Sequence, residues 1–147
     1  MITFRIADED DTHVVSQLLG NLFEEVGHTL TASEIADIFL QIDADDMHST
    51  LLALDEDGDA VGVITIVESL ALYAGGRIGV INELYVVPEY RSEGVGKLLL
   101  DAAKELADQR GWARIEVTTP GEDYAKTLRF YEREGFMPIG PRYKYLG

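Results

Sequence analysis

A junction between a strand and a helix, near the middle of the chain, constrains the fold more than any other feature. An apolar, strand-like run, Ile81–Val87, meets Pro88, and a glycine-spaced turn, Arg91–Lys97, then opens into a helical pattern. The first turn of a helix leaves backbone N–H groups unpaired, and its dipole favours negative charge. Gly94 and Gly96 have no Cβ, so an anion can approach the backbone closely. The junction therefore predicts a phosphate site within an α/β fold.

Two common phosphate motifs do not fit this turn. A P-loop would need glycine in place of Arg91 and serine or threonine in place of Leu98. A dinucleotide fingerprint would need a third glycine in place of Leu99. What remains is Arg-x-x-Gly-x-Gly after a strand, with Arg91 and Lys97 as two cations at its edge. Paired glycines before a helix are also ordinary loop residues, so this motif needs support from a second one.

That support comes from Phe130–Phe136, which reads Phe-Tyr-Glu-Arg-Glu-Gly-Phe. In their order and spacing, the two motifs resemble those of the GCN5-related N-acetyltransferase (GNAT) family. In that family the acetyl-CoA pyrophosphate loop reads Gln/Arg-x-x-Gly-x-Gly/Ala, and Phe-Tyr-x-x-x-Gly-Phe marks a helix end followed by a strand start. The resemblance covers the whole chain. It implies a single N-acetyltransferase domain, residues 1–147, with acetyl-CoA as co-substrate.

Periodicity along the chain predicts the element order β-α-α-β-β-β-α-β-α-β, with a final strand that is short or interrupted by Pro138 and Pro141. The fold class is α/β (α+β): a mixed, mostly antiparallel sheet of six to seven strands flanked by four helices. Strands are predicted at residues 2–6, 49–54, 60–73, 81–87 and 113–117, and helices from Asp8 or Asp10 to Val26, from Thr31 to Ile42, from Val95 to Gly111 and from Asp123 to Glu134.

Composition narrows the classes of partner. The 147 residues carry 27 acidic and 12 basic side chains, a net charge of −15, which argues against a nucleic-acid binder. Such a surface attracts a cationic acceptor, such as a polyamine, an aminoglycoside or a lysine-rich tail, although it also serves solubility. No apolar stretch reaches the roughly 18 residues of a membrane span. The N-terminus begins with a strand-like run instead of a signal peptide, so a cytoplasmic location is expected.

No metal is expected. The chain has no cysteine, and its three histidines, His13, His28 and His48, lack the spacing of a metal site. The acidic turn Asp55–Asp59 does not continue as an EF-hand loop, because the sixth and twelfth positions are Ala60 and Ile66.

Acyl transfer to an amine needs a base for the amine proton and a donor for the leaving thiolate. The resemblance implies Tyr131 as the donor; the alternative is a half-buried tyrosine at a helix end. For the base it implies Glu83 or Glu116, in strands that the family places beside the acyl group, or a water chain. The alternative for each glutamate is a solvent-facing or arginine-paired side chain, and the choice stays open.

The resemblance also implies the cofactor contacts. The central strand should bind the pantetheine amides through its backbone at Leu84, Tyr85 and Val86, with the oxyanion held by an N–H near Val86. The pyrophosphate loop comprises Arg91, Ser92, Glu93, Gly94, Val95, Gly96 and Lys97. One departure concerns the thiol end: Tyr124 and Thr127 stand where the family often has asparagine and alanine, after a long loop, 118–123.

The leading hypothesis is an N-acetyltransferase that acts by direct attack in a ternary complex on a primary amine of a small molecule or peptide. Glu24, Glu25 and His28 are candidates for the acceptor cleft, with a solvated helix face as the alternative. A homodimer is a further hypothesis. The rival from another class is a non-catalytic acyl-CoA-binding sensor, whereas a nucleotide-phosphate enzyme is disfavoured by the failed P-loop.

Overall fold

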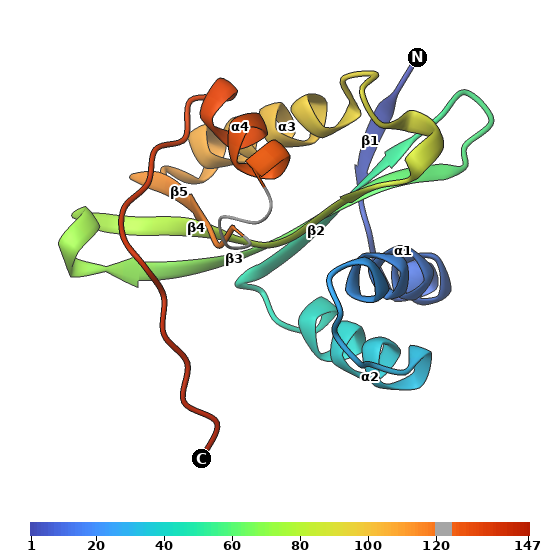
Figure 1. Cartoon of the computed structure of the whole chain (residues 1–147), viewed down its shortest axis with the longest axis horizontal. Helices are drawn as coiled ribbons and strands as arrows, with labels where there is room; N and C mark the ends of the chain where they lie inside the picture. Colours follow the sequence, from blue (N-terminus) through green and yellow to red (C-terminus); the bar gives the residue numbers. More distant parts are fainter. Residues whose placement is uncertain (120–124) are drawn as a thin grey trace. The chain divides into compact units, whose positions relative to one another are not determined.

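Residues 1–119 and 125–147 are described by the structure, a computed structural model (Figure 1). Contacts group the chain into two compact units, Met1–Glu116 and Val117–Gly147. The elements in chain order are β1 (Thr3–Ile6), η1 (Glu9–Asp11), α1 (Thr12–Glu25), α2 (Ala32–Asp43), β2 (His48–Leu54), β3 (Ala60–Ala71), η2 (Leu72–Ala74), β4 (Gly76–Val86), η3 (Pro88–Tyr90), α3 (Val95–Arg110), β5 (Arg114–Val117) and α4 (Ala125–Arg133), where η marks a 3-10 helix.

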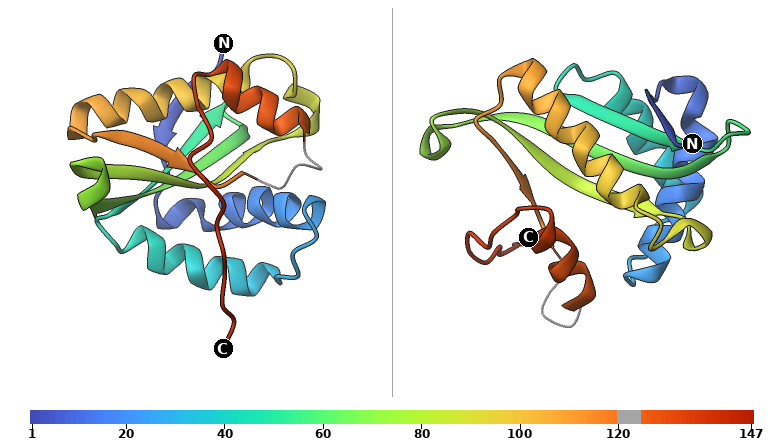
Figure 2. Two further views of the ribbon diagram at one scale, coloured as in Figure 1. Left: turned by 60° about the vertical axis from the view of Figure 1, so that its left-hand side comes forward. Right: turned by 90° about the horizontal axis from the view of Figure 1, so that it is seen from above.

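One sheet with the strand order β1-β2-β3-β4-β5 forms the centre of the first unit. The predicted meander of three consecutive antiparallel strands is confirmed, since β2 pairs with β3 and β3 with β4. α1 and α2 cover one face of the sheet and α3 the other (Figures 1 and 2). A row across the three strands, Leu52, Val63 and Tyr85, packs under α1 and α2 with the buried side chains of both helices. Because side chains alternate between the two faces along a strand, this row shows which face each neighbouring residue occupies.

Helix ends follow local signals in the sequence. The hydroxyl of Thr31 accepts the N–H of Glu34 and the Glu34 carboxylate accepts the N–H of Thr31, so the predicted capping box begins α2. α3 ends before Gly111, which has a φ of 69° and adopts the left-handed conformation that glycine tolerates. The predicted start of the last helix at Asp123, most of the loop 118–123, and Tyr124 lie outside the described residues.

The strand count is a correction. The sequence predicted six to seven strands, but the described residues contain five, all in one sheet. No strand follows α4: the described residues from Phe136 onward are irregular and mostly exposed. Pro138 and Pro141 explain this, because proline cannot donate a ladder hydrogen bond and restricts the residue before it. The prediction of a single domain stays a prediction.

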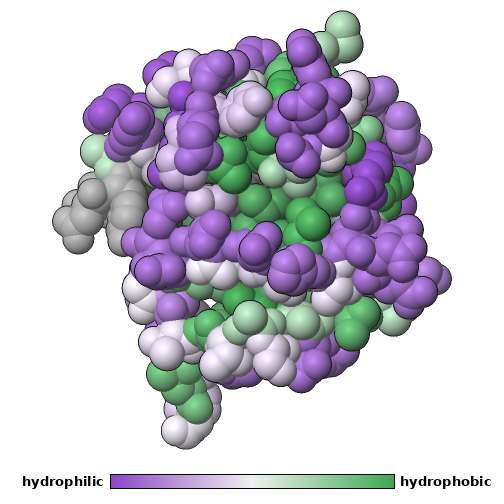
Figure 3. Space-filling view, turned by 90° about the vertical axis from the view of Figure 1, so that its right-hand side faces the viewer, coloured by the Kyte–Doolittle hydropathy of each residue, from purple (hydrophilic) through white to green (hydrophobic). Residues whose placement is uncertain are grey.

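The surface agrees with the acidic composition. Hydrophilic residues cover most of the face in Figure 3, and hydrophobic residues gather near its middle. None of the helices in the described part of the chain combines the length and the apolar character that crossing a bilayer requires.

Candidate active site

The turn between β4 and α3 presents backbone N–H groups at a helix start. Gly94 is the N-cap of α3 with a φ of 84°, and no side chain caps the helix there. The helix opens with the N–H of Leu98 bonded to the carbonyl of Gly94 at 3.0 Å. The N–H groups of Val95, Gly96 and Lys97 therefore precede the first helical hydrogen bond. Ser92 has a φ of 65°, the only positive φ outside glycine in the described chain. Such backbone strain is typical of ligand-binding turns.

Both cations of this turn have carboxylate partners. Arg91 Nη2 lies 2.7 Å from an oxygen of Glu25, at the end of α1, and Lys97 Nζ lies 2.7 Å from Asp101. Arg91 Nε also donates to the carbonyl of Val86 at 2.9 Å, and its guanidinium stacks over the ring of Tyr85. The two side chains remain 42% and 57% exposed. On a chain with a large excess of acid, each cation finds a nearby carboxylate, so the positive charge at the turn is weaker than the sequence suggests.

The last residues of β4 offer an open backbone edge. The N–H of Ala113 donates to the carbonyl of Arg77, so β5 begins beside the start of β4. The four residues of β5 extend about 13 Å, whereas Leu84 lies about 23 Å along β4 from Arg77. Within the described ranges, no strand therefore pairs with the outer edge at Leu84 and Val86.

Register decides which backbone groups face that edge. The N–H of Val87 donates to the carbonyl of Val61, and Tyr85 is opposite Val63. In an antiparallel ladder, hydrogen-bonded pairs alternate with non-bonded pairs. Tyr85 therefore turns its N–H and carbonyl toward β3, while Leu84 and Val86 turn theirs outward. Of the three predicted pantetheine contacts, the structure leaves two at the open edge and puts the side chain of Tyr85 in the core.

Glu83 lies on β4 directly before this edge, on the face covered by α1 and α2. Its N–H donates to Thr65 Oγ1 at 3.0 Å, and the Thr65 hydroxyl donates to Glu83 Oε1. The β3–β4 register shifts next to this pair, with Thr65 opposite Glu83 and Ile66 opposite Ile81, so Asn82 is an extra residue in β4. Burial raises the pKa of Glu83, against the opposing effects of the Thr65 hydrogen bond and the charge of His48.

Glu116, the second candidate base, has a different environment. On β5, its Oε2 accepts hydrogen bonds from the hydroxyl of Tyr73 at 2.7 Å and from Arg114 Nε at 2.9 Å. The guanidinium of Arg114 also lies over the ring of Tyr73. The structure thus does not bring the two glutamates into the same environment: Glu83 is shielded, and Glu116 is paired with an arginine.

Tyr131 belongs to the second unit, on α4. It is 8% exposed and packs edge-to-face against Phe130 and Phe136 at ring centroid distances of 5.1 and 5.6 Å. Burial raises the pKa of Tyr131 to about 12, so its hydroxyl stays protonated at neutral pH. Gly135, with a φ of 94°, follows the end of α4. The helix end predicted from the Phe-Tyr-x-x-x-Gly-Phe motif is therefore present.

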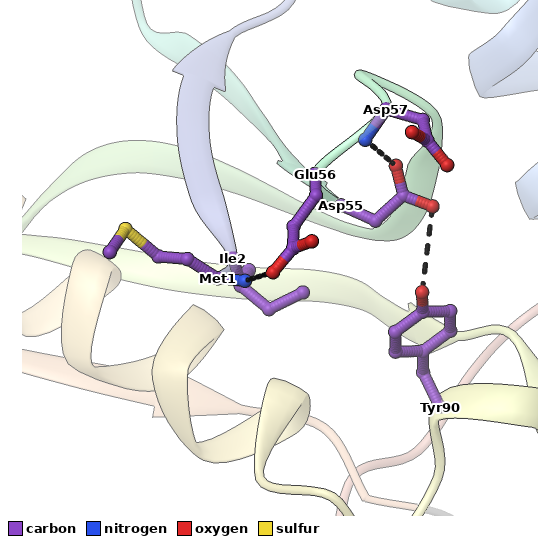
Figure 4. Close-up of a pocket in the computed structure, with 6 residues that line it drawn as sticks. All are labelled: Met1, Ile2, Asp55, Glu56, Asp57 and Tyr90. Atoms are coloured by element: carbon purple, nitrogen blue, oxygen red, sulfur yellow. Dashed lines mark hydrogen bonds and ion pairs between the residues drawn. The ribbon is translucent and has the colours of Figure 1, made fainter.

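A polar pocket lies elsewhere in the first unit (Figure 4). It is lined by Met1, Ile2, Asp55, Glu56, Asp57 and Tyr90. The N-terminal ammonium group pairs with Glu56 at 2.7 Å, and Asp55 Oδ1 accepts the N–H groups of Asp57 and Asp59. These acids stabilise their own turn, and none of the predicted site residues lines this pocket.

Comparison with known proteins agrees with the geometry. The profile of the acetyltransferase (GNAT) family matches residues 12–136, across both units. The chain belongs to the GNAT acetyltransferase family. An uncharacterised N-acetyltransferase of Bacillus subtilis, YhfO, is 27% identical over 135 residues, 92% of this chain and 89% of the relative. Glucosamine 6-phosphate N-acetyltransferase of Trypanosoma brucei brucei is also 27% identical, over 92% of this chain and 88% of its own.

A solved structure shows the same fold. An aminoglycoside N-acetyltransferase in complex with CoA superposes with a TM-score of 0.86 at 15% identity, over 100% of this chain and 95% of the other. The GNAT assignment makes acetyl transfer the general activity of this chain.

Three features of this candidate site were not predicted from the sequence. Thr65, a lone hydroxyl between Ile64 and Ile66, contacts Glu83, and a polar residue within an apolar strand was the available signal. The bulge at Asn82 has a similar signal, because Asn82 and Glu83 are consecutive polar residues where alternation would place only one. The Arg91–Glu25 contact has no such signal, since the two residues are 66 positions apart.

Proposed function

We propose that this GNAT protein transfers the acetyl group of acetyl-CoA to a primary amine by direct attack within a ternary complex. The observation that carries the proposal is the half-buried carboxylate of Glu83, next to a backbone edge of the same strand that no described strand pairs with. A carboxylate whose pKa is raised is a better base near neutral pH, and an outward N–H group is suited to binding a developing oxyanion.

In this mechanism, the N–H groups at the start of α3 hold the pyrophosphate, and those of Leu84 and Val86 hold the pantetheine arm and the thioester oxygen. The amine nitrogen attacks the thioester carbon while Glu83 accepts the amine proton. The tetrahedral intermediate then collapses, the C–S bond breaks, and the CoA thiolate takes a proton from the hydroxyl of Tyr131. Solvent returns that proton to Tyr131 and removes the other one from Glu83.

Glu83 is preferred to Glu116 as the base because their partners differ. Oε2 of Glu116 already accepts hydrogen bonds from Tyr73 and Arg114, which occupy the lone pairs of that oxygen. For Glu83, burial is the largest effect and raises the pKa. A water chain remains the third route, and the experiment below separates it from the two glutamates.

The acceptor is proposed to be a small amine that carries more than one positive charge. The segment Leu22–Ala32, from the last turn of α1 to the start of α2, contains Glu24, Glu25 and His28 but no lysine or arginine, and Glu24 is exposed. Such a surface attracts cations over about 10 Å at 0.1 M salt. The named acceptor of the Trypanosoma relative, glucosamine 6-phosphate, carries a phosphate and is therefore the natural competing candidate.

The test is a panel assay that follows CoA thiol release with polyamines, aminoglycosides, amino sugars and glucosamine 6-phosphate. With the best acceptor, Glu83→Gln is expected to lower kcat/KM by about 10²-fold or more, and Glu116→Gln by only a few-fold. A large loss in Glu116→Gln instead would reverse the assignment. Full activity in both variants would favour the water chain. Acetyl-CoA binding without thiol release for any amine would favour the non-catalytic sensor.

A further inference from the structure

The hydroxyl of Thr65 has a fixed role in its contact with Glu83. Thr65 is 2% exposed and stands directly opposite Glu83 in the β3–β4 register. Its Oγ1 lies 3.0 Å from the backbone nitrogen of Glu83 and within hydrogen-bond reach of Oε1 of the same residue. A backbone N–H group can only donate, so Thr65 Oγ1 is the acceptor in the first contact.

The state of Glu83 sets the direction of the second contact. A base must be ionised before it accepts a proton, and an ionised carboxylate can only accept hydrogen bonds. In that state the single proton of the Thr65 hydroxyl is donated to Glu83 Oε1. Oε1 of Glu83 therefore accepts the hydrogen bond from Thr65. The other carboxylate oxygen, Oε2, is then the one that can take up a proton from a second group.

We propose that Thr65 is a positioning residue for acetyl transfer: it holds Oε1 of Glu83 as a hydrogen-bond acceptor and leaves Oε2 to receive the proton of the attacking amine. This proposal rests on the proposed role of Glu83 as the base. The bond that forms is O–H at Oε2 and the bond that breaks is N–H of the amine, while Thr65 keeps its own proton throughout.

Titratable side chains occur on the elements that cover or flank the face of Glu83. They are His48 on β2, Glu68 on β3, His13, Glu24 and Glu25 on α1, Glu34, Asp37 and Asp43 on α2, and Arg114 and Glu116 on β5. Glu25 is paired with Arg91 and Glu116 with Arg114, whereas the charge of His48 acts on Glu83 and favours its charged form.

Thr50 offers a matched control, because Thr50, Thr65 and Glu83 lie opposite one another on β2, β3 and β4. It lies opposite Thr65 in the β2–β3 register and is 4% exposed, but its hydroxyl has no hydrogen-bond partner among the described residues. Replacement of either threonine by valine removes one buried hydroxyl at nearly constant volume. Only the replacement of Thr65 removes the donor to Glu83.

The first measurement needs no substrate. The side-chain carboxyl of Glu83 is titrated by carbon NMR in wild type, with Glu83→Gln used to assign the signal. Thr65→Val is expected to raise the pKa of Glu83, because a hydrogen bond to the charged form is lost. Thr65→Ser should return the titration to that of wild type, and Thr50→Val should leave it unchanged. If Thr65→Val does not fold, Thr65→Cys replaces it, with a weak thiol donor and the same expected direction.

The second measurement is the pH profile of kcat/KM for acetyl-CoA, with the best amine of the panel at saturation. In Thr65→Val the acidic limb should move to higher pH, with about a tenfold loss on that limb, the scale of one hydrogen bond to a charged group. Thr65→Ser should restore it. An unchanged NMR titration in Thr65→Val would overturn the proposal even if Glu83 is the base. A shifted titration with an unshifted rate profile would overturn it together with the role of Glu83. A uniform loss of rate at every pH would make Thr65 merely structural.

Discussion

The turn at the start of α3 and the Glu83 site, a few residues apart on the chain, use different chemistry. The turn offers backbone N–H groups, and its own cations are engaged by Glu25 and Asp101. The Glu83 site depends on one side chain whose burial, partner and direction come from the neighbouring strands. A backbone site tolerates changes of side chain as long as the chain keeps its path. A side-chain site changes its chemistry whenever its neighbours do.

The largest effect is expected at the turn, and it tests whether the backbone carries cofactor binding. Gly96 lies within α3 and its φ is not positive, so a side chain there does not strain the backbone. Gly96→Glu should weaken acetyl-CoA binding by about 10³-fold, since a carboxylate would face the pyrophosphate at short range. Calorimetry measures the affinity.

Gly96→Ala is the matched control and should lose far less, because it adds a methyl group without charge. Gly94 is a poorer position for this test, since its φ of 84° makes any side chain strained. Unchanged affinity in a folded Gly96→Glu variant would remove the turn from the cofactor site.

Tyr131, in the second unit, is another residue whose proposed role depends on its side chain. Because its pKa is raised to about 12, it remains a proton donor over the whole range of an ordinary assay. Tyr131→Phe should lower kcat by about 10²-fold while acetyl-CoA affinity stays within a few-fold. Single-turnover kinetics with calorimetry separates the two quantities. Undiminished turnover would leave Tyr131 with its packing role against Phe130 and Phe136 only.

Arg91 can act as a cation for the cofactor or as a structural link to α1 and the carbonyl of Val86. Two variants distinguish these roles. Arg91→Gln should weaken acetyl-CoA binding by about five- to tenfold through loss of a cation at the turn. Glu25→Gln should cause no loss, because it removes a carboxylate that competes for the same guanidinium. Affinities of both variants are compared at low and at 0.3 M salt. Equal losses in the two variants would mean that Arg91 acts as a brace to α1 and the carbonyl of Val86.

The smallest expected effect is on stability and concerns Glu83 alone. A raised carboxyl pKa means that the folded protein binds this proton more tightly than the unfolded chain does. The contribution of Glu83 to the free energy of unfolding therefore falls as pH rises from about 4.3, its unfolded value, through its folded pKa. Glu83→Gln should raise Tm at pH 7 to 8 by on the order of 2–4 °C, and the gain should vanish toward pH 4.

Thermal melts across this pH range measure the difference, with Glu116→Gln as the control for a paired glutamate. A gain in Glu83→Gln that is the same at every pH would mean that desolvation of the charge is not its cause. Wild type and variant share every other titrating group, so the difference between their melts isolates this one.

Sequence reasoning was most successful where the determining interactions are local. The strand, turn and helix at Ile81–Lys97, the capping box of Thr31 and Glu34, and the stop at Gly111 all depend on residues within a few positions of each other. The prediction of a final strand was wrong for the opposite reason. A strand needs a partner elsewhere in the chain, and Pro138 and Pro141 lack the N–H groups that such pairing requires.

The sequence by itself determined the fold class, the family and the glycine-spaced turn before α3, because helix ends and such turns follow from short-range sterics and hydrogen bonds. Only the tertiary structure distinguishes the environments of Glu83 and Glu116, the two candidate bases. Thr65, 18 positions away, donates to Oε1 of Glu83, while Tyr73 and Arg114 donate to Oε2 of Glu116. The basicity of a carboxylate is set by desolvation and by neighbouring charges, and both depend on which strands are brought side by side.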